Sequence, residues 1–333
     1  MTLSINPKLK DGTPGKRRGL LYLGVDGGGT RTTAWLADSR GRVLGRGVAG
    51  PSNPVKVGLP AAGRAILAAA KQARAGAVGT KLAAVCVGLA GADRPKISRP
   101  LALWLRKNVP AQSHLVTTDA AITLEAALGS LPGIVVIGGT GSIAWGRDPQ
   151  GRTLRSGGWG SAFDDAGSGY DLGRNAVHAA LRAFDGRGPR TRLVKTIPPA
   201  LKLGRITDII SLDLRPQEIA ALTPLVIAAA RDGDQVARGL LTRVGYDLAE
   251  LALALIRRFG RRRGPAIPVV CSGGLFKASR AVRLSFSWYL KHGAPRAQVR
   301  LLRREPVEGA LALARAAHPA SKSPPRGAGA ARL

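Results

Sequence analysis

The sequence has few aromatic residues, few cysteines and no long apolar segment. Aromatic residues make up 4% of the 333 residues, and there are two cysteines, Cys86 and Cys271. Both lie in apolar, strand-like stretches, so they supply neither a disulfide framework nor the spacing of a metal site. No apolar run approaches the roughly 18 residues of a membrane span, and the N-terminus lacks the apolar stretch of a secretory signal. We therefore expect a cytoplasmic protein without a membrane partner.

Acidic residues are also scarce, with 20 Asp and Glu against 51 Lys and Arg, for a net charge of +31. Such a charge suits nucleic-acid binding, but no nucleic-acid motif accompanies it and aromatic residues for base stacking are few. The charge is spread along the chain, with clusters at 16–18, 257–263 and 300–304. We expect no specific nucleic-acid partner, and we interpret the basic surface as one that attracts anionic substrates.

The remaining pattern is mixed α/β and occurs in two successive halves. In each half, three strands joined by tight turns are followed by alternating helices and strands. The strands are predicted at 20–26, 32–38, 43–49, 82–90, 114–119, 133–138, 142–147, 152–157, 267–271 and 299–302. The helices are predicted at 59–75, 96–107, 121–128, 170–184, 216–230, 235–259, 276–289 and 306–317. This order indicates a duplicated architecture with a ligand cleft between two lobes.

The domain boundaries follow from the same pattern. Residues 1–18 and 319–333 are polar or rich in Pro and Gly, and we expect both tails to be disordered. Residues 19–118 are predicted to form the first lobe, completed by a C-terminal helix within 305–318. Residues 119–304 are predicted to form the second lobe.

Three glycine-rich turns follow apolar strands: "DGGGTRT" from Asp26, "GGTGS" from Gly138 and "CSGG" from Cys271. Backbone N–H groups in such turns can bind phosphate oxygens. Asp26 would repel phosphate but suits Mg²⁺, which prefers oxygen ligands. One such turn is usually an ordinary hairpin, and the repetition favours a phosphate site. The spacing fits neither a P-loop nor a dinucleotide fingerprint, because the first turn leads into another strand.

These turns resemble the sugar kinase/Hsp70/actin ATPase superfamily and, more narrowly, the N-acetylglucosamine kinases and the BadF/BadG/BcrA/BcrD ATPase family. The other segments that carry the resemblance are "GPSN" at Gly50, "GLAGAD" at Gly88, "TDA" at Thr118, "GGWGSAFDDAGSG" at Gly157 and "PVEGA" at Pro306. It implies two ribonuclease-H-like (actin-like ATPase) lobes, each with a mixed five-stranded sheet, and use of ATP with Mg²⁺. It places the ATP phosphates and adenosine at Gly27, Gly28, Gly29, Thr30, Gly139, Thr140, Gly141, Gly273 and Gly274.

Two further acids are candidates for the chemistry. Asp93 follows a buried strand and a "GLAGA" turn, and the resemblance makes it the base that accepts the proton of a sugar hydroxyl. Asp119 ends a strand and is expected to bind magnesium or sugar. For both, the alternative is a helix N-cap. Relatives usually have Asn before the second acid, where this chain has Thr118.

The resemblance assigns the sugar to residues near the second glycine turn and to Asn53. Gly158, Trp159 and Asp165 match the sugar-binding loop, and Ser142 is a further expected contact. The family commonly has Glu after this Asp, where this chain has Ala166. Asn53 matches a position that reaches a sugar hydroxyl, although an Asn before Pro54 is also a common turn residue.

Three functions fit these observations. The leading one is ATP-dependent phosphorylation of an amino sugar, N-acetylglucosamine or glucosamine, at the 6-hydroxyl. The second is an ATPase that activates a reductase or dehydratase through an iron–sulfur cluster, which would need exposed cysteines. The third is a non-catalytic sensor that binds ATP or sugar. We expect a homodimer in the leading case.

Overall fold

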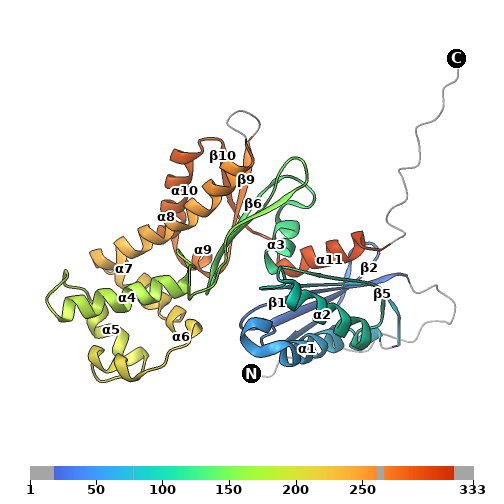
Figure 1. The fold of residues 1–333 in the computed structure, drawn as a ribbon, viewed down its shortest axis with the longest axis horizontal. Helices are drawn as coiled ribbons and strands as arrows, with labels where there is room; N and C mark the ends of the chain where they lie inside the picture. Colours follow the sequence, from blue (N-terminus) through green and yellow to red (C-terminus); the bar gives the residue numbers. More distant parts are fainter. Residues whose placement is uncertain (1–18, 78, 261–265, 319–333) are drawn as a thin grey trace, which may run out of the picture.

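The computed structural model describes residues 19–77, 79–260 and 266–318. The predicted tails at 1–18 and 319–333, and part of the basic cluster at 257–263, lie outside the described residues. Two five-stranded sheets with helices make up the described chain (Figure 1). We refer to each sheet with its helices as the first and the second lobe.

The first sheet has the strand order β3-β2-β1-β4-β5. The strands β1 (Leu21–Gly27), β2 (Thr32–Asp38) and β3 (Val43–Ala49) are antiparallel neighbours, whereas β4 (Leu82–Leu89) and β5 (Ala111–Thr117) run parallel to β1. Every residue of β4 is buried. This is the pattern of a central parallel strand with both faces covered, and the last residues of β1 and β4 therefore lie at one edge of the sheet.

Helices cover both faces of the first sheet (Figure 1). The helices α1 (Pro54–Ala73) and α2 (Pro95–Asn108) pack on one face, and α3 (Asp119–Leu128) and α11 (Pro306–Ala316) on the other. The chain thus returns from its C-terminal end to complete the first lobe. The expected boundary at residues 118 and 119 falls at the start of α3, which packs against elements of both sheets.

The second sheet repeats this topology, with the order β10-β9-β6-β7-β8. Its strands are β6 (Gly133–Gly138), β7 (Ser142–Arg147), β8 (Thr153–Gly157), β9 (Ile267–Ser272) and β10 (Ala297–Leu301). Its helices are α4 (Gly169–Phe184), α5 (Leu193–Ala200), α6 (Pro216–Ala220), α7 (Thr223–Arg231), α8 (Gln235–Arg258), α9 (Gly274–Ala278) and α10 (Arg280–Gly293). Short 3₁₀ helices span Ala75–Ala77 and Ile206–Ser211. The predicted pair of mixed five-stranded sheets is confirmed.

Three predicted helices differ in detail. The helix predicted at 216–230 is two helices, since Pro224 lacks a backbone N–H and favours a helix start. The helix predicted at 276–289 is also two, because Ser279 is extended and its side chain caps α10. The helix α1 begins five residues before its predicted start at Leu59, with a break at Gly58, where φ is 76°. The helix α5 was not predicted, because Pro198 and Pro199 argue against a helix.

The two cysteines lie in the strands β4 and β9 and are buried. Burial raises the pKa of each thiol to about 12. Neither thiol is available on the surface to bind a cluster between subunits. Among the described residues, no helix is both long and apolar enough to span a membrane.

The packing of α11 on α3 depends on Gly309. A Cβ at this position would lie 1.9 Å from the Ile122 carbonyl oxygen, so Gly309→Ala forces the two helices apart. We expect it to lower the free energy of unfolding by about 2–3 kcal/mol, as overpacking does, measured by urea denaturation. The control is Gly239→Ala in α8, where no atom lies within 4 Å of the added Cβ. This control should stabilise the protein by up to about 1 kcal/mol. Equal effects of the two substitutions would contradict the packing role.

Candidate functional site

The first glycine turn is fixed by the "GPSN" loop. The backbone N–H of Ser52 donates to the Gly28 carbonyl over 3.1 Å, and Thr32 Oγ1 lies 2.7 Å from both the Gly50 carbonyl oxygen and Ser52 Oγ. A Cβ on Gly27 would lie 1.9 Å from the Leu89 side chain. Gly27 is therefore required for packing between β1 and β4, and the turn beyond it has a fixed position.

Four of the predicted ATP-binding glycines differ in whether the structure leaves room for a side chain. Gly273 resembles Gly27, because its φ is 97° and an added Cβ would lie 2.2 Å from the Gly138 carbonyl oxygen. In contrast, a Cβ on Gly29 would meet only Lys56 Nζ, at 3.7 Å, and one on Gly274 would meet no atom within 4 Å. Gly29 and Gly274 therefore leave open space above the backbone, which a ligand could occupy.

The second glycine turn is fixed by the start of α4. The N–H of Gly169 donates to the Gly139 carbonyl over 2.8 Å, and the N–H of Tyr170 donates to the Thr140 carbonyl over 3.2 Å. The Ser168 side chain caps the helix. The "DDAGSG" segment thus connects the turn to α4.

Asp165 lies directly against this second turn. Its φ is 68°, which is unusual for a residue other than glycine, and the N–H of Ser142 donates to its carboxylate over 3.3 Å. A Cβ on Gly141 would lie 3.0 Å from the same carboxylate. Ser142 Oγ donates to the Ala166 carbonyl over 2.7 Å. Ser142 is 3% exposed, so its hydroxyl holds the Asp165 segment in place.

Asp26, at the end of β1, and Asp119, at the start of α3, form an acidic pair. Burial and the charge of Asp119 raise the pKa of Asp26 to about 7; the charge of Arg31 opposes this, and Glu305 makes a smaller contribution in the same direction as Asp119. Burial also raises the pKa of Asp119, and the charge of Asp93 adds to this. Two half-buried carboxylates that repel each other would gain from a divalent cation between them.

Their chemistry fits Mg²⁺, which takes one or two carboxylates and completes its shell with water and phosphate oxygens. Within residues 19–77, 79–260 and 266–318, no group of three or more His, Cys, Asp or Glu side chains is arranged to hold a metal. The acidic pair would therefore depend on the phosphate groups for the remaining ligands.

The observed N-caps of α2 and α3 are not Asp93 and Asp119, the residues for which the sequence left an N-cap role open. The N-cap of α2 is Arg94, without a side-chain cap bond, and Asp93 lies outside the helix. Thr118 caps α3, accepting from the Ala121 N–H over 3.0 Å, so the Thr in place of the usual Asn keeps a cap. Asp119 is the first residue of the helix, and its carboxylate accepts from the Ala120 N–H over 2.9 Å. Asn53 is the N-cap of α1 through Oδ1, which leaves its amide nitrogen for a ligand.

Trp159 carries an arginine on its ring. Its side chain is 56% exposed, and the Arg155 guanidinium carbon lies 3.9 Å from the ring centroid. Gly157, Gly158 and Gly160 around it all have positive φ, so the loop takes a path that needs these glycines. Arg155 also forms an ion pair with Asp93 over 3.2 Å. This contact joins the predicted sugar-binding loop of the second lobe to the predicted base in the first lobe.

Lys56 and Arg155 are two of the cations near the site that were not predicted from the sequence. Lys56 Nζ lies at the Gly29 turn. Partial burial lowers the pKa of Lys56, and the charge of Asp165 from the other lobe opposes this. Both missed residues lie beside predicted motifs: Lys56 follows "GPSN" and Arg155 precedes "GGWG". Their proximity to a motif was the signal that could have found them.

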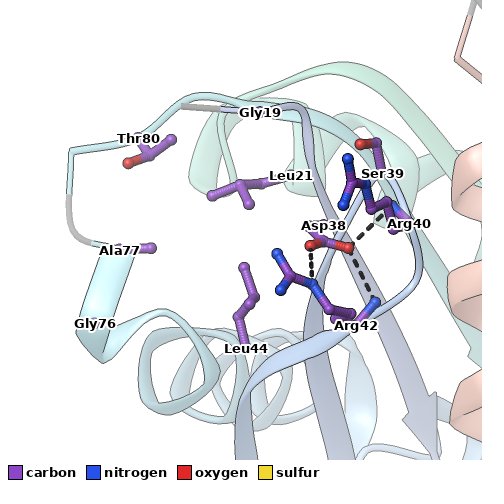
Figure 2. Close-up of a pocket in the computed structure, with 10 residues that line it drawn as sticks. All are labelled: Gly19, Leu21, Asp38, Ser39, Arg40, Arg42, Leu44, Gly76, Ala77 and Thr80. Carbon is purple, nitrogen blue, oxygen red and sulfur yellow. Dashed lines mark hydrogen bonds and ion pairs between the residues drawn. The ribbon is translucent and has the colours of Figure 1, made fainter. Parts of the chain in front are cut away.

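A hollow of about 480 Å³ lies elsewhere, at the opposite end of β1 (Figure 2). Leu21 and Leu44 border it, and its acid Asp38 is bound by Arg42 over 2.8 Å. None of the predicted site residues lines it. Its charged groups pair with each other, so this hollow is not the candidate site.

Comparisons with known proteins agree with this geometry. The BadF/BadG/BcrA/BcrD ATPase family matches residues 23–314, and the chain therefore belongs to this family. It is 32% identical to the N-acetylmuramic acid/N-acetylglucosamine kinase of Clostridium acetobutylicum over 88% of this chain and 97% of that one. It is 30% identical to the N-acetyl-D-glucosamine kinase of Dictyostelium discoideum, with the same coverage. A crystal structure of a candidate N-acetylglucosamine kinase from Chromobacterium violaceum, 28% identical, aligns with a TM-score of 0.75 over 89% of this chain and 99% of that one.

The raised pKa of Asp26 predicts a stability that depends on pH. The folded state binds this proton more tightly than the unfolded state, so the contribution is present below pH 3.8 and is lost as the pH rises through about 7. Asp26→Asn removes the buried charge. Without ligand, the variant should be more stable than the parent at pH 8 by a few kcal/mol, and nearly equal to it at pH 4.

The measurement is the free energy of unfolding at both pH values, with and without Mg–ATP. Mg–ATP should stabilise the parent more than Asp26→Asn. The control is Asp38→Asn, whose carboxylate is bound by Arg42 with a lowered pKa and which should show no gain at pH 8. A pH-independent effect of Asp26→Asn would contradict the burial argument.

Proposed function

We propose that the chain transfers the γ-phosphoryl group of ATP to the 6-hydroxyl of an amino sugar, N-acetylglucosamine or glucosamine. Membership of the ATPase family and the names of the two relatives support this proposal. The observation that carries it is the grouping of three acids at strand ends: the charge of Asp119 acts on Asp26, and that of Asp93 acts on Asp119. The open glycine turns lie at the same strand ends.

The backbone of Gly28, Gly29 and Thr30 would hold the phosphates from the first lobe, and Gly139, Thr140 and Gly141 from the second. Gly274, open above its backbone, would lie beside the adenosine. Lys56 Nζ, at the first turn, would neutralise charge on the transferred phosphoryl group. Asp26 and Asp119 would hold Mg²⁺, which when bound offsets the charge of the phosphate oxygens.

The sugar would lie between Asn53 of the first lobe and the loop of Gly158 and Trp159. Asp165 would accept from a sugar hydroxyl, and Ser142 would keep it in position through Ala166. Asp93 would accept the proton of the sugar 6-hydroxyl while the sugar 6-oxygen bonds to the γ-phosphorus. The bond from this phosphorus to the bridging oxygen of ADP breaks in the same step. Asp93 then releases its proton to water.

The test is a coupled assay of ADP release over a panel of sugars, with the product examined by ³¹P NMR. The expected result is turnover of N-acetylglucosamine or glucosamine with phosphate on the 6-oxygen, dependent on Mg²⁺. A protein that binds ATP and sugar without releasing ADP would be a sensor and would overturn the proposal. Light scattering on the same sample tests the expected homodimer.

The role of Asp93 predicts a selective loss of turnover. Asp93→Asn keeps the size of the side chain and removes its basicity, and Asp93 caps no helix. We expect kcat to fall by about 10²–10⁴-fold, the usual contribution of general-base assistance, while ATP affinity and melting temperature stay near those of the parent. Near-parent kcat in a normally folded variant would move the base assignment to another acid.

Lys56 gives a second prediction. Lys56→Met keeps the length of the side chain and removes its charge, so we expect the loss in transition-state stabilisation to lower kcat by about 10–100-fold and to weaken ATP binding. The control is Lys71→Met in the last turn of α1, an exposed residue of the same helix. Loss of sugar affinity alone would contradict a phosphate role for Lys56.

A further inference from the structure

Arg155 is placed to act on the reaction through Asp93. It lies on β8 in the second lobe, whereas Asp93 follows β4 in the first lobe. Their ion pair, at 3.2 Å, connects Arg155 Nη1 with Asp93 Oδ2. Many of the other ion pairs in the described chain join residues three or four positions apart. This one joins residues 62 positions apart, so the fold brings them together.

Arg155 makes one further contact through its side chain and one through its backbone. Its guanidinium carbon lies 3.9 Å from the Trp159 ring centroid, a cation–π contact. Its backbone carbonyl accepts from Arg258 Nη1 over 2.8 Å. The side chains of Arg155 and Asp93 are 26% and 25% exposed, so the pair is more shielded than the exposed pairs of the surface. Such a guanidinium can set the direction of a carboxylate.

We infer that Arg155 is a positioning residue that holds Asp93 Oδ2, so that Oδ1 is directed at the acceptor hydroxyl. This inference rests on the proposed function. The stack on Trp159 makes the placement of Arg155 depend on the loop that would carry the sugar. The orientation of the base is then correct only when the sugar loop of the second lobe is in place. Arg155 itself touches neither the phosphate nor the hydroxyl in this arrangement.

The test is a double-mutant cycle on kcat, with saturating sugar and radiolabelled ATP so that slow variants can be measured. Arg155→Met should lower kcat about 10–100-fold, the usual cost of misplacing a reacting group, and leave the KM for ATP unchanged. In the Asp93→Asn background the same substitution should change kcat less than about threefold, because residues that act as a unit are not additive.

Two further variants separate positioning from folding. Arg155→Lys keeps the charge without the planar fork, so it should retain an intermediate kcat even where Arg155→Met is poorly folded. Arg152→Met on the same hairpin is the matched control, since Arg152 pairs with Asp148 over 2.7 Å and lies outside the site. Its kcat should equal that of the parent.

The outcomes are distinguishable. If the parent phosphorylates no amino sugar, the proposed function fails, and the role of Arg155 fails with it. If the parent is active and Arg155→Met lowers kcat by the same factor in the parent and in Asp93→Asn, only the positioning role is overturned, and Arg155 is structural. A loss confined to substrates that carry a carboxylate would assign Arg155 to that substituent and would also overturn it.

Discussion

Repulsion between half-buried carboxylates is the interaction around which this site is organised. Asp26 and Asp119 come from different elements, and each is harder to ionise because of burial and a nearby acid. Like charges in such a place are tolerated when a cation or a ligand compensates for them. Arg31 lowers the pKa of Asp26 without cancelling the effects of burial and of Asp119, whereas Lys56 acts on Asp165 and Arg155 pairs with Asp93. We therefore expect the acidic pair to be the part of the site most dependent on a bound metal.

The sequence was sufficient for the framework of the site. Glycines and acids at strand ends are local signals, and the duplicated order of strands placed them at corresponding edges of two sheets. The predicted family and fold are confirmed. The roles of the individual site residues remain predictions, although the geometry removes the helix-cap alternatives for Asp93 and Asp119.

The contacts of Arg155 and the helix α5 depend on long-range packing. Arg155 stands beside the "GGWG" motif, but nothing local predicts its contacts, because its partner Asp93 is distant in sequence and Trp159 alone does not reveal the stack. One predicted helix was wrong for the opposite reason, because a local hydrogen bond divides it. Ser279 divides two helices through a local cap bond, and a serine inside an apolar periodic stretch is too common to indicate a break. The helix α5 forms despite two prolines because Leu193 and Ile197 are fully buried in the core of the second lobe.

The chain crosses between the two sheets twice, and an acidic residue lies at each crossing. Asp119 begins α3, which leads to the second sheet, and Glu305 precedes α11, which returns to the first. Both carboxylates act on Asp26. Because α3 and α11 pack together on the first sheet, these acids keep their distance to Asp26 if the second lobe moves. The Arg155–Asp93 pair, in contrast, spans the lobes and would change with such a movement. The fold therefore separates the proposed metal site, carried by one lobe, from the proposed base, whose orientation depends on both.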